Sequence, residues 1–322
     1  MEEKGIAKLL IIPEAVRTLQ RKLYTKAKQE PAYRFYALYD KVWRADILMH
    51  AYCLVRANKG SPGVDGMNFD DIEQKTGIDT FLLELAQDLK NKTYTPSPVR
   101  RVMIPKADGS QRPLRIPTIR DRVAQMVAKL HFEPLVELYF HADSYGYRPN
   151  KSAHQALEVT IKRCWRHDWA LEFNIKGLFD NIDHQLLMKA VRKHTSYRWL
   201  LLYIERWLTA PIELEDGAIM VRKRGVPQGG VISPVLSNLF MHYAFDMWME
   251  RQFPERPFCH YADDGLVHCK DEAEAKAIKI ALADRLQECG LEMHPDKSKI
   301  HLTRNMFHGE WNYRIDPRPI VG

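Results

Sequence analysis

Apolar residues recur at helical spacing in several stretches of the chain. Near the start, Val16, Leu19 and Leu23 form a stripe at positions i, i+3 and i+7, which is one face of a helix. Residues 271–289 repeat this spacing over a longer stretch, and Gly290 is placed to end it. These patterns predict amphipathic helices that bury one face.

Other stretches have the composition of strands joined by hairpin turns. Residues 99–105 and 112–116 flank a turn that contains glycine, and residues 258–261 and 266–269 flank Ala-Asp-Asp-Gly. Residues 169–175 are typical of a buried strand. Strands mixed with helices and hairpins predict an α+β fold, with an antiparallel sheet and helices on one face of it.

The pattern also predicts three finer features. Pro134 should break the helix over residues 120–139. Residues 233–248 should form one apolar helix, and residues 291–294 should form a last strand.

The composition is that of a globular protein with about two domains. The chain has 322 residues, of which 45% are hydrophobic and 28% are charged. Its apolar runs are far shorter than the roughly 20 residues that span a bilayer, and its start has no secretory leader. We therefore expect a cytoplasmic protein with no membrane partner.

The five cysteines form neither a disulfide framework nor a C-x-x-C metal knuckle. A metal site built from Cys259, His260, His268 and Cys269 is one interpretation of the paired strands that carry them. Packing is the favoured interpretation of these cysteines, because no knuckle is present.

Basic residues outnumber acidic ones and gather in particular segments. The 48 Lys and Arg residues against 41 Asp and Glu give a formal net charge of +7. Such clusters suit a polyanion, because each neutralised phosphate releases a condensed counterion. The alternative is a set of solvated faces without a partner. The basic residues expected to contact nucleic acid are Arg17, Arg21, Lys22, Arg100 and Arg101.

Two adjacent carboxylates, Asp263 and Asp264, are the sharpest chemical feature of the chain. They would lie at a hairpin tip, where two negative charges cost stability unless a cation compensates them. Mg²⁺ suits such hard oxygen ligands and typically takes one or two protein carboxylates plus substrate phosphates. The alternative is an ordinary Asp-rich turn.

The neighbouring motifs favour the magnesium site and carry a resemblance to a known family. Residues 225–234 place a glycine pair before a helix, and residues 104–106 and 112–113 put two cations on a hairpin. From about residue 39 to residue 300, the chain resembles the retron-type and group II intron-encoded reverse transcriptases. The blocks that match, in chain order, are residues 57–66, 101–121, 145–149, 174–183, 225–239, 261–265 and 290–299.

The resemblance implies a right-hand polymerase fold with fingers and palm, whose antiparallel palm sheet is backed by helices. The implied divisions are a basic N-terminal extension over residues 1–32, fingers over 33–166, palm over 167–300 and a tail over 301–322. The thumb and the later domains of the family are expected to be absent. A homodimer is not indicated.

The same resemblance implies roles for single residues and names partners. Asp263 and Asp264 would ligate two Mg²⁺ ions that align the 3′-hydroxyl of a DNA primer with a deoxynucleoside triphosphate on an RNA template. Intron RNA is the other implied partner. Lys106 and Arg112 would hold the triphosphate, Gln228 and Gly229 would flank the nucleotide, Phe179 would crowd a ribose 2′-hydroxyl, and Lys297 would contact nucleic acid.

The chain departs from the family at the first metal-ligand position, where Asn174 stands in place of an Asp. An amide is nearly isosteric with a carboxylate but is neutral, so metal binding should weaken. Asp180, six positions further on, is not expected to substitute. We therefore expect an RNA-directed DNA polymerase that is impaired by Asn174 and by the absent thumb. The alternative is a catalytically inactive, maturase-like module that binds intron RNA.

Overall fold

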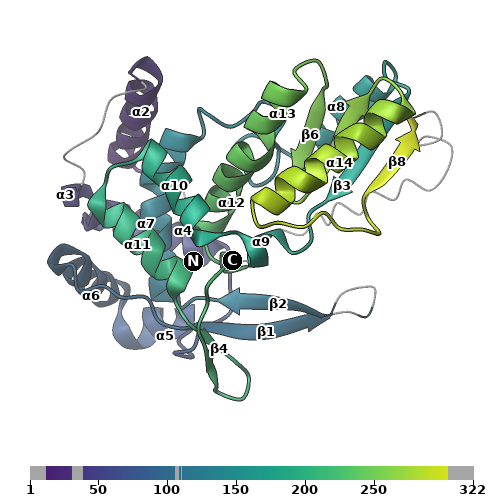
Figure 1. Cartoon of the computed structure of the whole chain (residues 1–322). Helices are drawn as coiled ribbons and strands as arrows, with labels where there is room; N and C mark the ends of the chain where they lie inside the picture. The colour runs from purple at the N-terminus through teal and green to yellow at the C-terminus, as the bar shows by residue number, and fades with distance from the viewer. Residues whose placement is uncertain (1–11, 31–38, 106–108, 110, 304–322) are drawn as a thin grey trace. The chain divides into compact units, whose positions relative to one another are not determined.

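In the computed structural model, the described residues are 12–30, 39–105, 109 and 111–303, and they divide into two units (Figure 1). Of these residues, unit 1 holds those up to Leu138 and Val191–Ser233, and unit 2 holds Tyr139–Ala190 and those from Pro234 onward. The two units therefore alternate along the chain, and each is described by itself. Within the described ranges, no helix combines the length and the apolar character needed to cross a membrane.

Unit 1 is built around one buried helix, α7 (Ile119–Val136), against which α2 (Glu14–Gln29) and α4 (Ala45–Ala57) pack. The N-terminal stripe behaves as expected, because Val16 and Leu23 are buried on α2 while Arg17 faces solvent. The remaining helices of this unit are α3 (Tyr39–Val42), α5 (Phe69–Asp71), the π-helix η1 (Ile72–Thr76), α6 (Ile78–Asn91) and α11 (Arg198–Thr209).

The break expected at Pro134 is wrong, because α7 continues through this residue and ends at Val136. Pro134 lacks the N–H that would reach the carbonyl four residues back, so α7 loses one hydrogen bond there, and only two more helical residues follow it. The helix start is fixed by Thr118, whose side chain caps the N–H of Asp121.

A four-stranded sheet in unit 1 has the order β2-β1-β4-β5. The hairpin of β1 (Val99–Pro105) and β2 (Gln111–Ile116) confirms the expected strands, and β4 (Ile212–Glu213) and β5 (Ile219–Met220) form a second hairpin. The base of the first hairpin is tied to α7, because the buried carboxylate of Asp121 accepts hydrogen bonds from Tyr94 Oη at 2.6 Å and Ser97 N at 3.1 Å.

Unit 2 contains an antiparallel sheet with the order β6-β7-β3-β8. Its strands are β3 (Trp169–Asn174), β6 (Phe258–Tyr261), β7 (Asp264–Cys269) and β8 (Lys299–Leu302). The expected strand over residues 291–294 is wrong: Met293 makes an isolated bridge to Ile175, and regular pairing with β3 begins at Lys299. Pro295 follows directly and lacks the N–H that a ladder requires.

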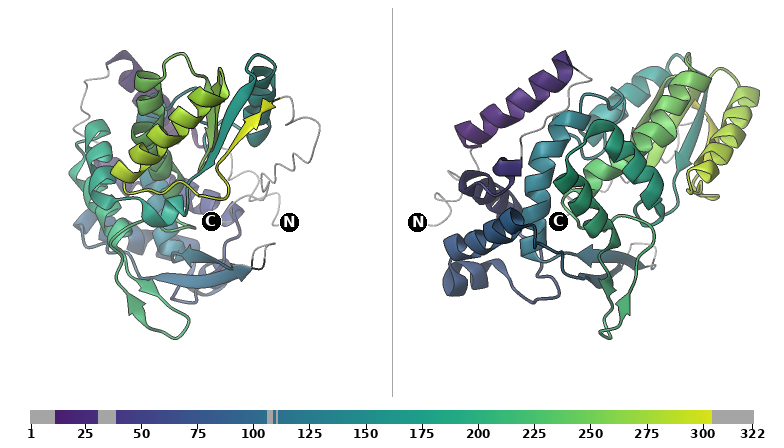
Figure 2. Two further views of the ribbon diagram at one scale, coloured as in Figure 1. Left: turned by 45° about the vertical axis from the view of Figure 1, so that its right-hand side comes forward. Right: turned by 60° about the vertical axis from the view of Figure 1, so that its left-hand side comes forward.

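Helices cover both faces of this sheet, where the sequence indicated one. On one face, Cys164 of α8 (Ala153–Cys164) packs with Ala170 and Leu266. On the opposite face, α14 (Glu272–Glu288) contacts β3 and β7, and Figure 2 shows this helix in yellow-green along the strands. Phe245 also packs there, with its ring centroid 4.9 Å from that of Phe173.

The predicted apolar helix over residues 233–248 is present but not uniform. It divides into α12 (Ser233–Met241), the π-helix η2 (His242–Asp246) and α13 (Met247–Gln252). Hydrophobic spacing alone does not show where i→i+5 hydrogen bonds replace i→i+4 bonds. Two further helices, α9 (Leu178–Asn181) and α10 (His184–His194), follow β3 in the sequence.

Candidate functional site

The adjacent carboxylates lie at the tight turn between β6 and β7. Tyr261 pairs with Asp264, so Ala262 and Asp263 form a two-residue loop. Ala262 has a φ of 55°, in the left-handed region that such hairpin turns require. Asp264 begins β7 and Asp263 precedes it, which places both carboxylates at one end of the sheet.

Asn174 is brought to the same end by the register of β3 against β7. It pairs directly with Asp264, and facing residues of an antiparallel pair project to the same side of a sheet. Asn174 Nδ2 donates a hydrogen bond to Asp264 Oδ1 at 2.5 Å and a longer one to Asp263 Oδ2 at 3.5 Å. The amide therefore bridges the two carboxylates that the sequence singled out.

The main chain of Asn174 is held from both sides, and its side chain has little freedom to move away. Asn174 N donates to Ser298 Oγ at 3.2 Å, and Asn174 O accepts from His294 N at 2.7 Å. Lys279 Nζ in turn donates to Ser298 O at 2.7 Å. With 7% of its surface exposed, Asn174 is a buried polar residue. Its position is fixed by residues that precede strand β8.

The surroundings of Asp264 leave its carboxylate with less hydration than a free carboxylate has. Part of the residue reaches solvent, but protein atoms crowd its carboxylate, and the lost hydration raises its pKa. Donation from Asn174 and the charge of Lys297 act in the opposite direction, whereas Glu172 adds to the rise. A cation beside the carboxylate would compensate the deficit.

The residues present match a magnesium site in part. Asp263 and Asp264 provide two carboxylates, the number with which proteins often bind Mg²⁺ beside substrate phosphates. Asn174 adds a neutral amide, and Asp180 lies on α9. In the part of the chain that the structure describes, no group of three or more His, Cys, Asp or Glu side chains is arranged to hold a metal ion.

An aromatic cluster adjoins the carboxylate turn. Phe179, on α9, is buried, and its ring centroid lies 6.2 Å from that of Tyr147 in an edge-to-face arrangement. The ring of Tyr147 also lies 5.8 Å from that of Tyr261. The motif pattern assigned a role to Phe179. Tyr147 and Ser298 lie in matching blocks but received no role, because their roles depend on contacts between segments distant in the sequence.

Three of the residues expected to hold the nucleotide come together in unit 1. Arg112 Nε donates to Gln228 Oε1 at 2.9 Å, and Arg115 N donates to Gln228 O at 2.8 Å. Gly229 follows with a φ of +111°, and a Cβ there would lie 2.6 Å from Arg115 O. A glycine is therefore required at this close approach of two main chains. Lys106 lies outside the described residues.

The basic residues expected to meet nucleic acid have different environments. Arg17, Arg21 and Lys22 are exposed on α2, and Lys297 is exposed before β8. Arg100 and Arg101 are partly buried on β1. The polar face of α2 is thus available to a polyanion, whereas the β1 arginines present only part of their surface.

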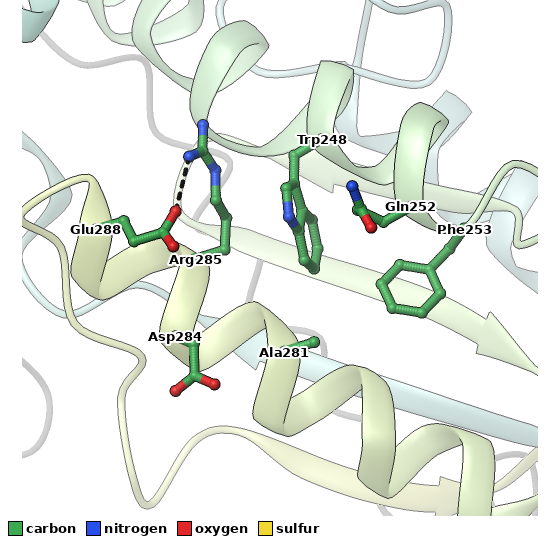
Figure 3. Close-up of a pocket in the computed structure, with 7 residues that line it drawn as sticks. All are labelled: Trp248, Gln252, Phe253, Ala281, Asp284, Arg285 and Glu288. Atoms are coloured by element: carbon green, nitrogen blue, oxygen red, sulfur yellow. Dashed lines mark hydrogen bonds and ion pairs between the residues drawn. The ribbon is translucent and has the colours of Figure 1, made fainter.

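One surface pocket lies away from these residues, between α13 and α14 (Figure 3). Trp248 and Phe253 face it, and Arg285 lines it together with its ion-pair partner Glu288 at 3.1 Å. It contains no residue that the sequence singled out.

Comparisons with known proteins identify a family model that matches most of the chain. The family model described as "Reverse transcriptase (RNA-dependent DNA polymerase)" matches residues 104–314. Protein YkfC of Escherichia coli is 31% identical, over 88% of this chain and 84% of that protein. The group II intron-encoded protein LtrA of Lactococcus lactis is 33% identical over 69% of this chain, which spans 38% of its length.

A solved structure of apo telomerase from Candida tropicalis is similar to 68% of this chain and 54% of its own, with 13% identity and a TM-score of 0.46.

Proposed function

Because this chain belongs to the reverse transcriptase family, we propose that it is an RNA-directed DNA polymerase of the group II intron type, with its nucleotidyl-transfer site impaired at Asn174. The observation that carries the proposal is the bridge from Asn174 Nδ2 to Asp264 Oδ1 at 2.5 Å. Family, strand order and turn together support a polymerase site in which one of three acidic positions is an amide.

The bridge has two consequences for cation binding. Asn174 removes one negative charge from the cluster, and its N–H group donates to an oxygen that a cation would otherwise use. A cation would have to break this hydrogen bond and rely on two carboxylates. Loss of one charged partner from a buried pair costs about 3–5 kcal/mol, and a loss of that order in cation binding would suppress catalysis.

In this proposal, each residue acts on a particular part of the substrates. Asp263 and Asp264 would hold Mg²⁺, which would supply Lewis-acid chemistry for the primer hydroxyl and the leaving phosphates. The guanidinium of Arg112, oriented by Gln228, offers the planar donor set that suits a phosphate.

Other residues act on the nucleotide and on the nucleic-acid strands. Gly229 lets the loop approach the main chain of Arg115 and so keeps Gln228 beside Arg112, and Phe179 fills the space beside a ribose 2′-carbon. Exposed Arg17, Arg21 and Lys22 contact the phosphates of an RNA template or of intron RNA.

A second function is favoured by the same hydrogen bonds. Because Asn174 donates to both carboxylates, the cluster is partly compensated without a cation. A chain of this kind can keep its fold and its exposed basic helix and bind structured intron RNA without catalysis. Its polymerase motifs would then have a structural role.

Single-nucleotide primer extension on an RNA template with Mg²⁺ tests the proposal. The comparison includes the wild type, Asn174→Asp, and Asn174→Asp combined with Asp263→Asn. Asn150→Asp is the matched control, because it adds the same charge at an exposed residue of unit 2 that already has a positive φ. We expect Asn174→Asp to extend at least about 100-fold faster than the wild type, and Asp263→Asn to abolish the gain.

Equal extension by the wild type and by Asn174→Asp would contradict the metal argument. If no variant extends the primer while all bind RNA with a steep dependence on salt, the second function is the better account.

A further inference from the structure

We propose that Tyr147 is a positioning residue that holds the ring of Phe179 in place and thereby sets how strictly the site selects deoxyribonucleotides over ribonucleotides. The inference rests on the proposed function, because it takes the nucleotide site to lie beside the Asp263–Asp264 turn. It assigns a role to a residue outside the carboxylate cluster.

The backbone of Tyr147 is the first observation. Its φ is 56°, in the left-handed region, which side chains other than glycine, asparagine and aspartate rarely adopt. Residues in such conformations persist only where their surroundings hold them, and they concentrate at functional sites. Ala262, in the carboxylate turn, is a second residue of this kind.

The segment that carries Tyr147 is fixed directly to the carboxylate turn. A Cβ at Gly146 would lie 2.6 Å from Ala262 N, so the two main chains are in contact and only glycine fits. Gly146 O accepts a hydrogen bond from the buried amide of Asn238 at 2.7 Å, and Tyr145 N donates to His260 O at 2.9 Å. These contacts leave Tyr147 no freedom to follow a side chain that moves.

The ring of Tyr147 occupies the space between two other rings. It meets Phe179 edge to face, at 6.2 Å and an interplanar angle of 74°, and it meets Tyr261 at 5.8 Å and 54°. Phe179 lies on α9, a helix of only one turn, which by itself gives the ring little support. A ring on a fixed backbone therefore supports a ring on a short helix.

This arrangement has a specific consequence for selectivity. A bulky ring excludes a 2′-hydroxyl only if it cannot yield when the hydroxyl presses against it. Without the ring of Tyr147, Phe179 could shift into the vacated space and admit a ribonucleotide. Loss of Tyr147 should therefore change the preference between two sugars, rather than the affinity for nucleotides in general.

The test measures nucleotide binding without requiring chemistry. The full chain is bound to an RNA template whose primer ends in a dideoxynucleotide, so that no bond can form. The complementary dATP or ATP is then added at increasing concentration. The measured quantity is the nucleotide concentration at which half of the complex survives the addition of a competitor strand. The variants are Tyr147→Ala, Tyr147→Leu, Tyr147→Phe, Phe179→Ala and the Tyr147→Ala/Phe179→Ala double variant. Tyr139→Ala, an exposed tyrosine of the same unit, is the matched control.

We expect Tyr147→Ala to lower the preference for dATP over ATP by about 3- to 10-fold, the range that one aromatic pair provides. Tyr147→Leu keeps a bulky side chain but no ring, so it should lose a similar part of the preference. It also provides the test if the alanine variant does not fold. Tyr147→Phe and Tyr139→Ala should retain the preference. The double variant should lose no more than Phe179→Ala alone, because Tyr147 acts through Phe179.

The inference is overturned if Tyr147→Ala weakens dATP and ATP by the same factor, or if the wild type binds both equally. Primer extension separates this result from the fate of the proposed function. Extension by Asn174→Asp with an unchanged sugar preference in Tyr147→Ala contradicts the inference alone. A shifted preference without any extension contradicts the polymerase proposal alone.

Discussion

Gly265 shows how a residue that looks like part of a turn can be required by packing. In Tyr-Ala-Asp-Asp-Gly it has the composition of a turn, yet it lies inside β7 and pairs with Phe173. A Cβ at this position would lie 2.2 Å from Phe173 Cζ. The glycine therefore makes room for a core ring directly beneath the carboxylates.

Gly265→Ala should destabilise the protein by about 1–3 kcal/mol, because the added methyl group forces Phe173 out of its rotamer or the strand out of register. Urea denaturation measures this cost. Repeating the substitution in a Phe173→Leu background should make the cost smaller, since the clashing ring carbon is gone. Equal costs in the two backgrounds would show that the clash is not the cause.

At the scale of elements, the π-helix η2 delivers two consecutive side chains to the sheet of unit 2. Phe245 packs against Phe173 and Phe258, and Asp246 Oδ1 lies 2.9 Å from His260 Nε2 on β6. Both members of this ion pair have 1% of their surface exposed. Burial alone raises the pKa of Asp246, but His260 and His242 more than offset this, so its pKa lies below the usual range.

Asp246→Asn should destabilise the protein by about 3 kcal/mol, because His260 and His242 lose the buried carboxylate that both of them face. The matched control is Glu272→Gln, which breaks the exposed pair between Glu272 and Lys276 at 2.7 Å and should cost less than about 0.5 kcal/mol. Denaturant unfolding with both variants compares them. A cost no larger than that of the control would mean that the buried pair does not anchor β6.

At the scale of the whole molecule, the sequence predicted the class of the fold and the strands that carry the carboxylates. Strands 99–105 and 258–261 were recoverable because their residues are β-formers bounded by turn residues. The last strand was misplaced because residues 291–294 alternate apolar and polar side chains as a strand does, but Pro295 interrupts them. Periodicity also cannot reveal η2, whose hydrogen bonds differ by one residue from those of a regular helix.

The residues of the candidate site were predictable, but the contacts that hold them were not. The order of motifs singled out Asn174, Asp263 and Asp264, and the register of β3 against β7 brings them within hydrogen-bond reach. The direction of the amide bridge and the supports from Ser298 and Tyr147 were not predictable. They arise from contacts between segments that are far apart in the sequence.

The stability of the molecule should depend on pH through His268. This side chain is fully buried, and its Nε2 has no hydrogen-bond partner among the described residues. Burial, followed by the charges of His167 and Arg163, lowers its pKa to about 3. The unfolded chain, with a histidine pKa of about 6.5, takes up the proton first, so stability is full above that pH and is lost as the pH falls below it.

His268 alone should remove about 2 kcal/mol of stability between pH 7 and pH 5. His268→Gln should flatten this part of the stability profile, whatever its cost at pH 7. His154→Gln, at an exposed histidine of α8, is the control and should leave the profile unchanged. Denaturant midpoints measured at several pH values provide the comparison, and an unchanged acid slope in His268→Gln would exclude this histidine as its source.

The most direct test of the account is the affinity of the carboxylate cluster for a divalent cation. Titration of the full chain with Mn²⁺, with the free ion followed by electron paramagnetic resonance, compares the wild type, Asn174→Asp and the control Asn150→Asp. If Asn174 disables the site, Asn174→Asp should bind Mn²⁺ at least about 100-fold more tightly than the wild type, and Asn150→Asp should not differ from it. Equal affinity of the wild type and Asn174→Asp would contradict the claim that one amide separates this chain from a working metal site.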